Sequence, residues 1–106
     1  MSVIHIKDTE EYNKYIKETK DKLVVVDYSA VWCGPCKYIA KPYEKLSEEK
    51  TDAIFLKVDI DECKDIADDE QIMGVPTFKF WKNGALVDEL VGADQRKLRE
   101  LTEKHI

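Results

Sequence analysis

Two cysteines three positions apart, in the segment Cys33-Gly-Pro-Cys36, are the residues of this sequence best suited to chemistry. Residues three apart on a helix lie on the same side, close enough for the Cα separation of about 4.4 to 6.8 Å that a disulfide requires. The pair can therefore open and close a disulfide without a change of fold. A dithiol of this kind exchanges electron pairs with the disulfides of other molecules.

The position of the pair predicts different roles for the two thiols. The segment follows an apolar run typical of a buried strand and stands at the first turn of a predicted helix. Unpaired N–H groups and the positive end of the helix dipole favour an anion there and lower the pKa of a thiol. We therefore expect Cys33 to attack a target disulfide. Cys36, one turn further in and better shielded, then resolves the mixed disulfide.

A structural zinc site and an inert buried pair are the two other interpretations of these cysteines. A structural zinc ion takes four ligands. Besides Cys33 and Cys36 the chain offers only Cys63, His5 and His105, and the two histidines stand near opposite ends of the sequence. We therefore expect no metal. The total of three cysteines leaves one thiol free if the other two pair.

Asp27 is the one charged residue in the apolar run from Leu23 to Tyr28. A carboxylate buried there loses its hydration, so it either has a partner or has a raised pKa. Cys36 must lose a proton before it can resolve the mixed disulfide, and the strand that carries Asp27 leads into the cysteine loop. We therefore assign Asp27 the role of the general base. The alternative is that Asp27 caps a neighbouring segment.

The length and composition of the chain limit its class. At 106 residues, with 43% hydrophobic and 37% charged residues, we expect one domain over 1–106 with an ordinary core rather than a disordered chain. The formal net charge of −5 opposes binding to nucleic acid or to anionic lipid. No run of about 18 apolar residues predicts a membrane span, and the first residues lack a signal-peptide pattern, so we expect a cytoplasmic protein.

Hydrophobic periodicity predicts alternating strands and helices that position the cysteine loop. We expect strands over 3–7, 23–28, 53–59, 77–82 and 85–91, the last two joined by a turn at Asn83-Gly84. Asp8 and Asp94 are predicted N-caps of two helices, and Glu11 can reach back to the first of them. A helix after Cys36 runs to about residue 49 with a kink at Pro42, and a short acidic helix covers 62–69. This order predicts an α/β fold, a central mixed sheet of about five strands flanked by about four helices.

The motifs together resemble the thioredoxin family. Trp32-Cys-Gly-Pro-Cys36 follows Asp27-Tyr-Ser-Ala30, and downstream come Gly74-Val-Pro-Thr-Phe78, Lys82-Asn-Gly84 and Val91-Gly-Ala93 in the family's order. The resemblance implies the thioredoxin fold and a monomeric protein-disulfide reductase with no bound cofactor. It also implies an electron carrier that thioredoxin reductase regenerates with electrons from NADPH. The implied clients include peroxiredoxins, methionine sulfoxide reductases and ribonucleotide reductase.

The same resemblance implies roles for further residues. Pro76 should follow a cis peptide bond against the cysteine pair, and Lys57 should lie beside Asp27. Together with these two, Gly34 and Pro35 would tune the redox pair. A flat apolar surface for client proteins would comprise Trp32, Val75, Pro76, Gly92 and Ala93. The alternative for Trp32 is a residue of the core.

Cys63 stands outside these motifs, at a place similar to that of an extra cysteine in many animal-type cytosolic thioredoxins, and it is a candidate regulatory thiol. Its acidic neighbours disfavour the thiolate, so we expect a quiet, partly buried thiol. Asp59, Asp61 and Glu70 also match positions 1, 3 and 12 of a calcium loop. Lys64 replaces the glycine of that loop, which favours a solvated acidic face instead.

Two other classes of function remain as alternatives. A glutaredoxin-like or disulfide-isomerase-like domain would usually carry Pro-Tyr or Gly-His between the cysteines, whereas this chain has Gly34-Pro35. A binding subunit that uses the fold as a scaffold, such as a processivity factor, would keep its activity after both Cys33 and Cys36 were replaced by serine.

Overall fold

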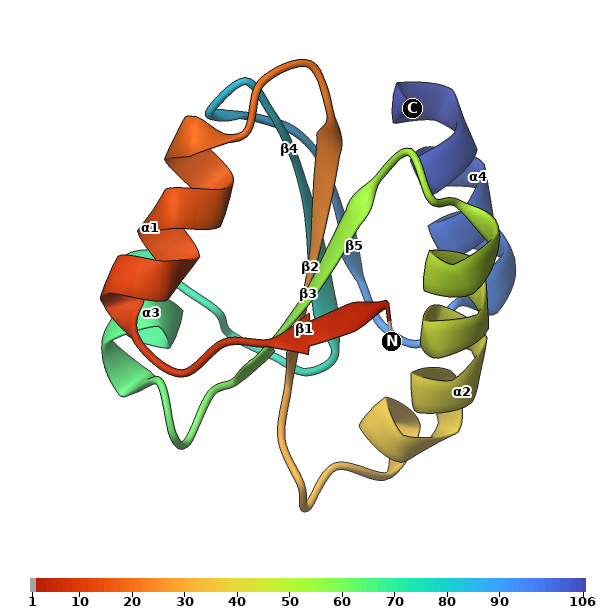
Figure 1. Cartoon of the computed structure of the whole chain (residues 1–106). Coiled ribbons are helices and arrows are strands. Elements are labelled where there is room, and N and C mark those ends of the chain that lie inside the picture. The colour runs from red at the N-terminus through yellow and green to blue at the C-terminus, as the bar shows by residue number, and fades with distance from the viewer. Residues whose placement is uncertain (1) are drawn as a thin grey trace.

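A five-stranded β-sheet runs through the middle of the molecule, with two helices against each of its faces (Figure 1). The computed structural model describes residues 2–106. The strands are β1 (Val3–His5), β2 (Leu23–Ser29), β3 (Ile54–Asp59), β4 (Thr77–Lys82) and β5 (Ala85–Val91). The helices are α1 (Thr9–Glu18), α2 (Gly34–Glu49), α3 (Lys64–Asp69) and α4 (Gln95–His105). The predicted element order is confirmed.

The sheet is mixed, with strand order β1-β3-β2-β4-β5. Strands β1, β3 and β2 are parallel, while β4 is antiparallel to both β2 and β5. Asn83 and Gly84 have φ angles of 53° and 80° in the β4–β5 turn. This turn matches the predicted hairpin, because two-residue hairpin loops favour positive φ at both residues.

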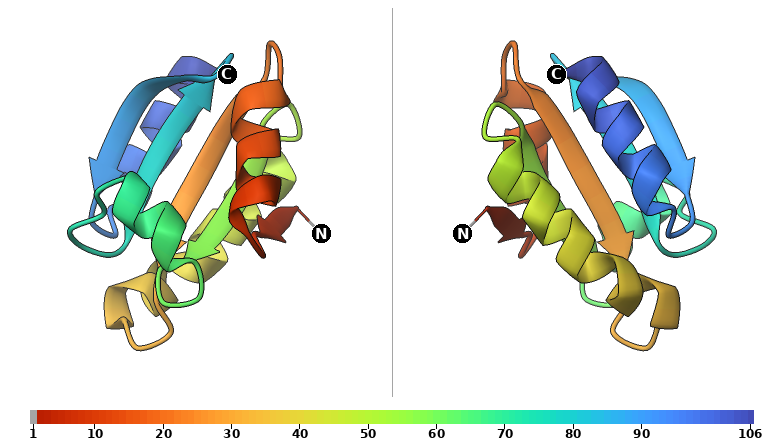
Figure 2. Two further views of the ribbon diagram at one scale, coloured as in Figure 1. Left: turned by 90° about the vertical axis from the view of Figure 1, so that its left-hand side faces the viewer. Right: turned by 90° about the vertical axis from the view of Figure 1, so that its right-hand side faces the viewer.

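Side chains of the central strand β2 alternate between two separate cores. Leu23 and Val25 pack beneath α2 and α4, whereas Val24, Val26 and Tyr28 pack on the side of α1 and α3. Figure 2 shows the two pairs of helices on opposite faces of the sheet. Because alternate residues of a strand share a face, Asp27 points to the α2 side, inside the first core.

The predicted helix caps are confirmed. The carboxylate of Asp8 accepts the N–H of Glu11 at 2.8 Å, and the Glu11 side chain accepts the N–H of Lys7 at 2.8 Å. Asp94 accepts the N–H of Lys97 at 3.0 Å in the same way. These contacts satisfy backbone donors that have no partner inside the helix. Helix α2 continues through Pro42 to Glu49.

Some element ends differ from the sequence-based prediction. Strand β1 ends at His5 rather than at residue 7, and α3 begins at Lys64 rather than at residue 62. The later start of α3 has a local cause. Asp59 accepts the N–H groups of Asp61 and Glu62 at 2.8 and 3.2 Å, which holds this segment in a turn.

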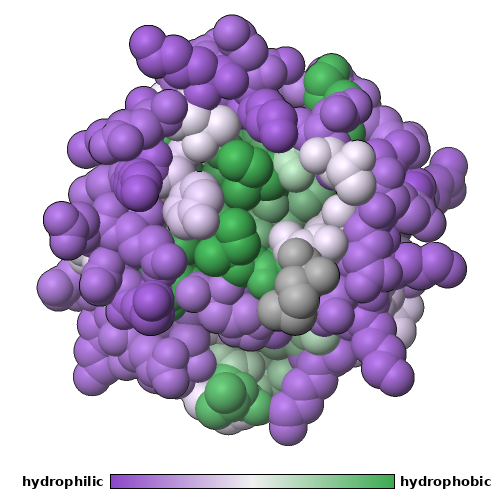
Figure 3. Space-filling view, viewed as in Figure 1, coloured by the Kyte–Doolittle hydropathy of each residue, from purple (hydrophilic) through white to green (hydrophobic). Residues whose placement is uncertain are grey.

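The edge of the sheet at β1 faces the viewer in Figure 1. In the space-filling view of the same face, apolar residues gather at the centre and hydrophilic residues surround them (Figure 3). Within residues 2–106, no helix has the length and apolar character needed to cross a membrane.

Candidate active site

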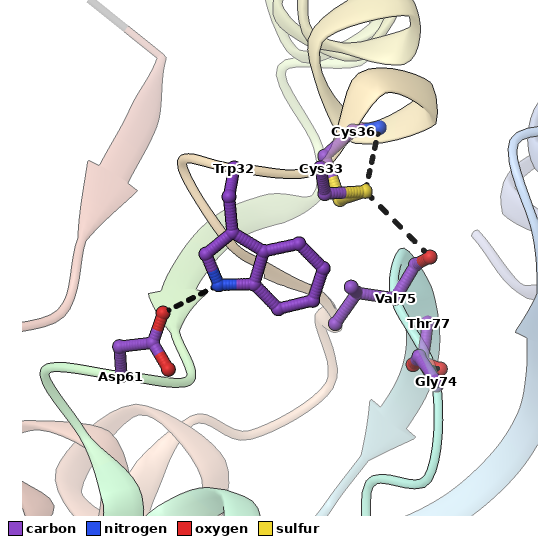
Figure 4. Close-up of a disulfide and its surroundings, with 7 residues drawn as sticks. All are labelled: Trp32, Cys33, Cys36, Asp61, Gly74, Val75 and Thr77. Carbon is purple, nitrogen blue, oxygen red and sulfur yellow. Dashed lines mark hydrogen bonds between the residues drawn. A yellow bond between two sulfur atoms is a disulfide. The ribbon is translucent and has the colours of Figure 1, made fainter.

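The cysteine pair lies where the loop after β2 enters α2. Cys33 is the N-cap of α2, and Gly34 and Pro35 form the start of its first turn. Proline suits this place because the first helical residues have no carbonyl partner for an N–H group. Cys33 and Cys36 form a disulfide with a Cα–Cα distance of 5.2 Å (Figure 4). The helix start therefore holds the two sulfur atoms together, as the spacing predicts.

The two sulfur atoms have different surroundings. The N–H of Cys36 donates to Sγ of Cys33 at 3.1 Å, and the same sulfur lies 3.7 Å from the carbonyl oxygen of Val75 (Figure 4). In the disulfide form the two residues are almost equally shielded, so the expected difference in shielding stays a prediction for the dithiol form. Cys33 is 4% exposed and Cys36 is 3% exposed. The asymmetry lies in the hydrogen bond to Cys33.

Three chain segments meet around the disulfide. The Val75–Pro76 peptide bond is cis, as the resemblance implied. The N–H of Gly92 donates to the carbonyl oxygen of Pro76 at 2.8 Å, which ties the segment after β5 to the segment before β4. Val75 packs against both cysteines, and Ala93, next to Gly92, packs on the first core. Pro76 is buried, while Val75, Gly92 and Ala93 are partly exposed.

Trp32 lies on the surface beside Val75 (Figure 4). Its side chain is 65% exposed, so the alternative of a core residue is wrong. The indole Nε1 donates to a carboxylate oxygen of Asp61 at 2.8 Å. This contact could not be predicted from local sequence, because Trp32 and Asp61 stand 29 positions apart. Met73, which is 95% exposed shortly before Val75, was also not predicted.

Asp27 is a buried carboxyl group with a raised pKa. It is 0% exposed, and neither carboxylate oxygen has a hydrogen-bond partner among the described residues. Burial raises the pKa of Asp27 to about 7, and the nearby positive charge of Lys57 opposes part of this rise. The alternative that Asp27 caps a neighbouring segment is wrong, because its side chain accepts no backbone N–H within residues 2–106.

Lys57 lies directly opposite Asp27 in the register of β2 and β3. The two side chains therefore share the α2 face of the sheet, as the resemblance implied. They interact through charge without a salt bridge, since no nitrogen of Lys57 hydrogen-bonds the carboxylate. An attraction of this kind leaves Asp27 free to take up and release a proton near neutral pH.

A pocket of about 400 Å³ opens behind Cys36. Its walls come from the start of α2, the end of β2, β3, β1 and the segment before α3. The lining residues are His5, Ile6, Ser29, Ala30, Val31, Cys36, Lys37, Ala40, Lys57, Asp59 and Glu62. Cys36 and Lys57 therefore line one shared pocket.

Cys63 is a buried free thiol at the start of α3. Its Sγ lies 3.7 Å from the carbonyl oxygen of Ile6. Burial raises the pKa of the Cys63 thiol, and the negative charges of Glu62 and Asp59 raise it further. Both features agree with the expectation of a quiet thiol, and its low reactivity stays a prediction.

The acidic segment that matches a calcium loop has other partners. The hydroxyl of Tyr12 donates to Glu70 at 2.8 Å, and the ammonium of Lys79 lies 3.5 Å from the same carboxylate. Within residues 2–106, no three His, Cys, Asp or Glu side chains come close enough to hold a metal ion together.

The fold and the cysteine geometry define a class of protein. A mixed sheet carries a Cys-x-x-Cys disulfide at a helix start, next to a segment with a cis-proline, and the strand before the disulfide holds a buried carboxyl group. This arrangement is that of a dithiol–disulfide oxidoreductase.

Comparisons with known proteins identify the family. The family model described as Thioredoxin matches residues 3–104. Thioredoxin of Geodia cydonium is 45% identical over 101 residues, which cover 94% of this chain and 95% of that protein. Thioredoxin of Homo sapiens is 44% identical over 96 residues, 91% of each chain. The structure of Plasmodium falciparum thioredoxin superposes with a TM-score of 0.92 at 42% identity, covering 97% of this chain and 99% of that one.

The chain belongs to the thioredoxin family. Members of the family are disulfide oxidoreductases that use a redox-active disulfide, and Cys33 and Cys36 form the disulfide in that position.

Proposed function

We propose that this protein reduces disulfides in other proteins by a two-cysteine mechanism, with Cys33 as nucleophile and Cys36 as resolving thiol. The observation that carries the proposal is the hydrogen bond from the N–H of Cys36 to Sγ of Cys33 at 3.1 Å. In the dithiol form this N–H, at the positive end of α2, stabilises a negative charge on Cys33. No donor of the helix start serves Cys36 among the described contacts.

The first step forms a mixed disulfide. The Cys33 thiolate attacks one sulfur of the client disulfide, a new S–S bond forms, and the client S–S bond breaks. The second client sulfur leaves as a thiolate and takes a proton from solvent. The client binds beside Cys33 on the surface of Trp32, Val75, Pro76, Gly92 and Ala93. The carbonyl of Val75, 3.7 Å from the attacking sulfur, is placed to meet an extended client segment.

The second step releases the reduced client. Cys36 gives its thiol proton to the carboxylate of Asp27, and the resulting thiolate attacks Sγ of Cys33. The Cys33–Cys36 bond forms, and the client leaves as a thiolate. A pKa of about 7 suits Asp27 to this work, because a general base is most effective when its pKa lies near the working pH. Lys57 holds that pKa in range by favouring the charged form of Asp27.

Regeneration of the dithiol needs an external reductant. We propose thioredoxin reductase, with electrons from NADPH, as that partner, and peroxiredoxins, methionine sulfoxide reductases and ribonucleotide reductase as clients, by analogy with the family. We also propose that the chain works as one domain and as a monomer in the cytoplasm. Gly34 and Pro35, which shape the first turn of α2, and Pro76 tune the redox pair in this proposal.

Turnover of insulin disulfides with dithiothreitol tests the proposed function. We expect the wild-type protein to accelerate insulin reduction, and Cys33→Ser to abolish the acceleration. Cys63→Ser is the matched control, because it removes a buried thiol outside the pair, and it should retain wild-type turnover. Full turnover by Cys33→Ser would contradict the mechanism. A biological activity that survives the double replacement of Cys33 and Cys36 would instead favour the scaffold function.

A further inference from the structure

Lys79 is a buried ammonium group on β4 that the proposed mechanism does not use. The residue is 8% exposed. Its Nζ donates to the backbone carbonyl oxygen of Glu70 at 2.9 Å and lies 3.5 Å from the carboxylate of the same residue. The carboxylate of Glu89, on the neighbouring strand β5, is 4.0 Å away. A lysine is rarely buried without partners of this kind. Lys79 therefore holds Glu70 at both its backbone and its side chain.

Glu70 is the residue at which α3 ends and the loop toward the disulfide begins. The next residue, Gln71, has a φ angle of 55°. A residue other than glycine stays in this left-handed conformation only where the surrounding structure holds it there. Tyr12 of α1 also holds Glu70, because its hydroxyl donates to the Glu70 carboxylate at 2.8 Å. Lys79 and Tyr12 therefore fix the start of the loop from two different elements.

The other end of the loop is fixed by the strand that carries Lys79. Thr77 begins β4, and Lys79 follows two residues later. The Oγ1 of Thr77 donates to the carbonyl oxygen of Gly74 at 2.6 Å. Between Glu70 and Thr77 lies Val75, whose carbonyl oxygen is 3.7 Å from the Sγ of Cys33 (Figure 4). Strand β4 therefore holds both ends of the loop that reaches the disulfide.

We propose that Lys79 is a positioning residue for client binding, which holds Glu70 so that the loop presents the carbonyl of Val75 beside Cys33. This inference rests on the proposed function, in which an extended client segment binds along Val75. Replacing a buried ion pair by apolar side chains often costs no stability, and the best-supported use of such a pair is to select one arrangement of the chain. A loop that is held in advance spares the client the entropy cost of ordering it. Loss of the Lys79 contacts should therefore weaken client binding and leave the chemistry of the cysteines unchanged.

Amide hydrogen exchange tests whether Lys79 holds the loop. Lys79→Met removes the ammonium group and keeps an unbranched side chain. The N–H of Ile72 donates back to α3, and the N–H of Gly92 donates to the carbonyl oxygen of Pro76. These two amides therefore report on the two ends of the loop. We expect both to exchange about tenfold faster in Lys79→Met, because the loop opens more often.

Lys82→Met is the matched control. Lys82 ends β4, at the opposite end of the strand from Thr77, and its Nζ donates to the carbonyl oxygen of His105 at 3.0 Å. The lost contact is of the same kind, from a lysine to a carbonyl at a helix end, but it does not touch the loop. Lys82→Met should leave exchange at Ile72 and Gly92 at the wild-type rates. Lys79→Arg, which keeps the charge and the donors, should do the same.

Kinetics with insulin and saturating dithiothreitol test the consequence for clients. In Lys79→Met we expect KM for insulin to rise by about three- to tenfold, while kcat changes by less than about twofold. Reduction of a small aromatic disulfide, which is too short to bind along the loop, should keep its wild-type rate. Lys82→Met and Lys79→Arg should keep the wild-type KM. Lys79→Gln, whose amide stops short of the position of Nζ, is measured in the same way if Lys79→Met does not fold.

Wild-type exchange at Ile72 and Gly92 in Lys79→Met, or an unchanged KM for insulin, would overturn the inference. Equal losses with insulin and with the small disulfide would also overturn it, because Lys79 would then act on the cysteines or on the whole fold. If the wild type itself does not accelerate insulin reduction, the proposed function is wrong, and the role of Lys79 in client binding is wrong with it. The exchange rates would still show in that case whether Lys79 holds the loop.

Discussion

The backbone N–H of Cys36 donates to Sγ of Cys33 at 3.1 Å. This contact makes the two cysteines chemically different although both are equally buried in the disulfide form. A sulfur that accepts a hydrogen bond at a helix start is stabilised as a thiolate. Cys36 instead lines the pocket behind it, and in our proposal Asp27 takes up its proton.

The first prediction concerns which thiol reacts. In the reduced protein at pH 7, a limiting amount of iodoacetamide should modify Cys33 before Cys36 and Cys63. Cys63 should be the slowest, because burial and nearby carboxylates raise the pKa of its thiol. Mass spectrometry of peptides after short reaction times measures the order. Modification of Cys63 ahead of Cys33 would show that the helix start does not activate Cys33.

The second prediction concerns the rate at which the mixed disulfide is resolved. Asp27→Asn removes the proton acceptor, so resolution at pH 7 should slow by at least about tenfold. The wild-type rate should rise between pH 6 and 8 with a midpoint near the pKa of Asp27, about 7. Rapid-quench kinetics with a labelled client disulfide measures both rates. The control is Asp88→Asn, which changes a carboxylate bound to His105 far from the pair in sequence; it should keep the wild-type profile.

The third prediction is a stability difference that depends on pH. The pKa of Asp27 is raised from 3.8 to about 7 in the folded protein. Between these values the folded state holds a proton that the unfolded state has lost, so stability contributed by protonated Asp27 decreases as pH rises. Relative to Asp27→Asn, the oxidised wild type should lose about 4 kcal/mol between pH 4 and pH 8. Urea denaturation of both proteins at both pH values measures this difference. If the difference in free energy of unfolding between the wild type and Asp27→Asn did not change with pH, it would contradict the burial of an unpaired carboxyl group.

The fourth prediction concerns the orientation of Trp32. Asp61 accepts the indole N–H at 2.8 Å and fixes a large exposed side chain beside the disulfide. Asp61→Ala should free the indole and raise KM for a protein client by about threefold, which is the effect expected from the loss of one modest hydrogen bond. The reaction with small disulfides, which do not use the surface, should keep its rate. Equal effects on protein and small disulfides would mean that Asp61 acts on the cysteines instead.

The redox pair and the buried carboxyl group of Asp27 could be predicted from local sequence. Cys33 and Cys36 share one turn of a helix, and Asp27 interrupts an apolar strand, so spacing and periodicity suffice for both. The cis bond before Pro76 came from the resemblance alone, because local sequence favours trans.

Contacts between distant segments could not be predicted. The hydrogen bond between Trp32 and Asp61 and the one from Gly92 to the carbonyl oxygen of Pro76 depend on which distant segments the fold brings together.

Trapping of the mixed disulfide tests the central claim most directly. Cys36→Ser, reduced and mixed with a protein client that contains one disulfide, should accumulate a covalent adduct joined through Cys33. Mass spectrometry of the adduct, with and without dithiothreitol, locates the bond. The account predicts a stable adduct at Cys33 in Cys36→Ser and none in Cys33→Ser under the same conditions. Two results would contradict the account. One is an adduct through Cys36 in Cys33→Ser that forms as fast as the Cys33 adduct in Cys36→Ser, and the other is a client bond to Cys63 in either variant.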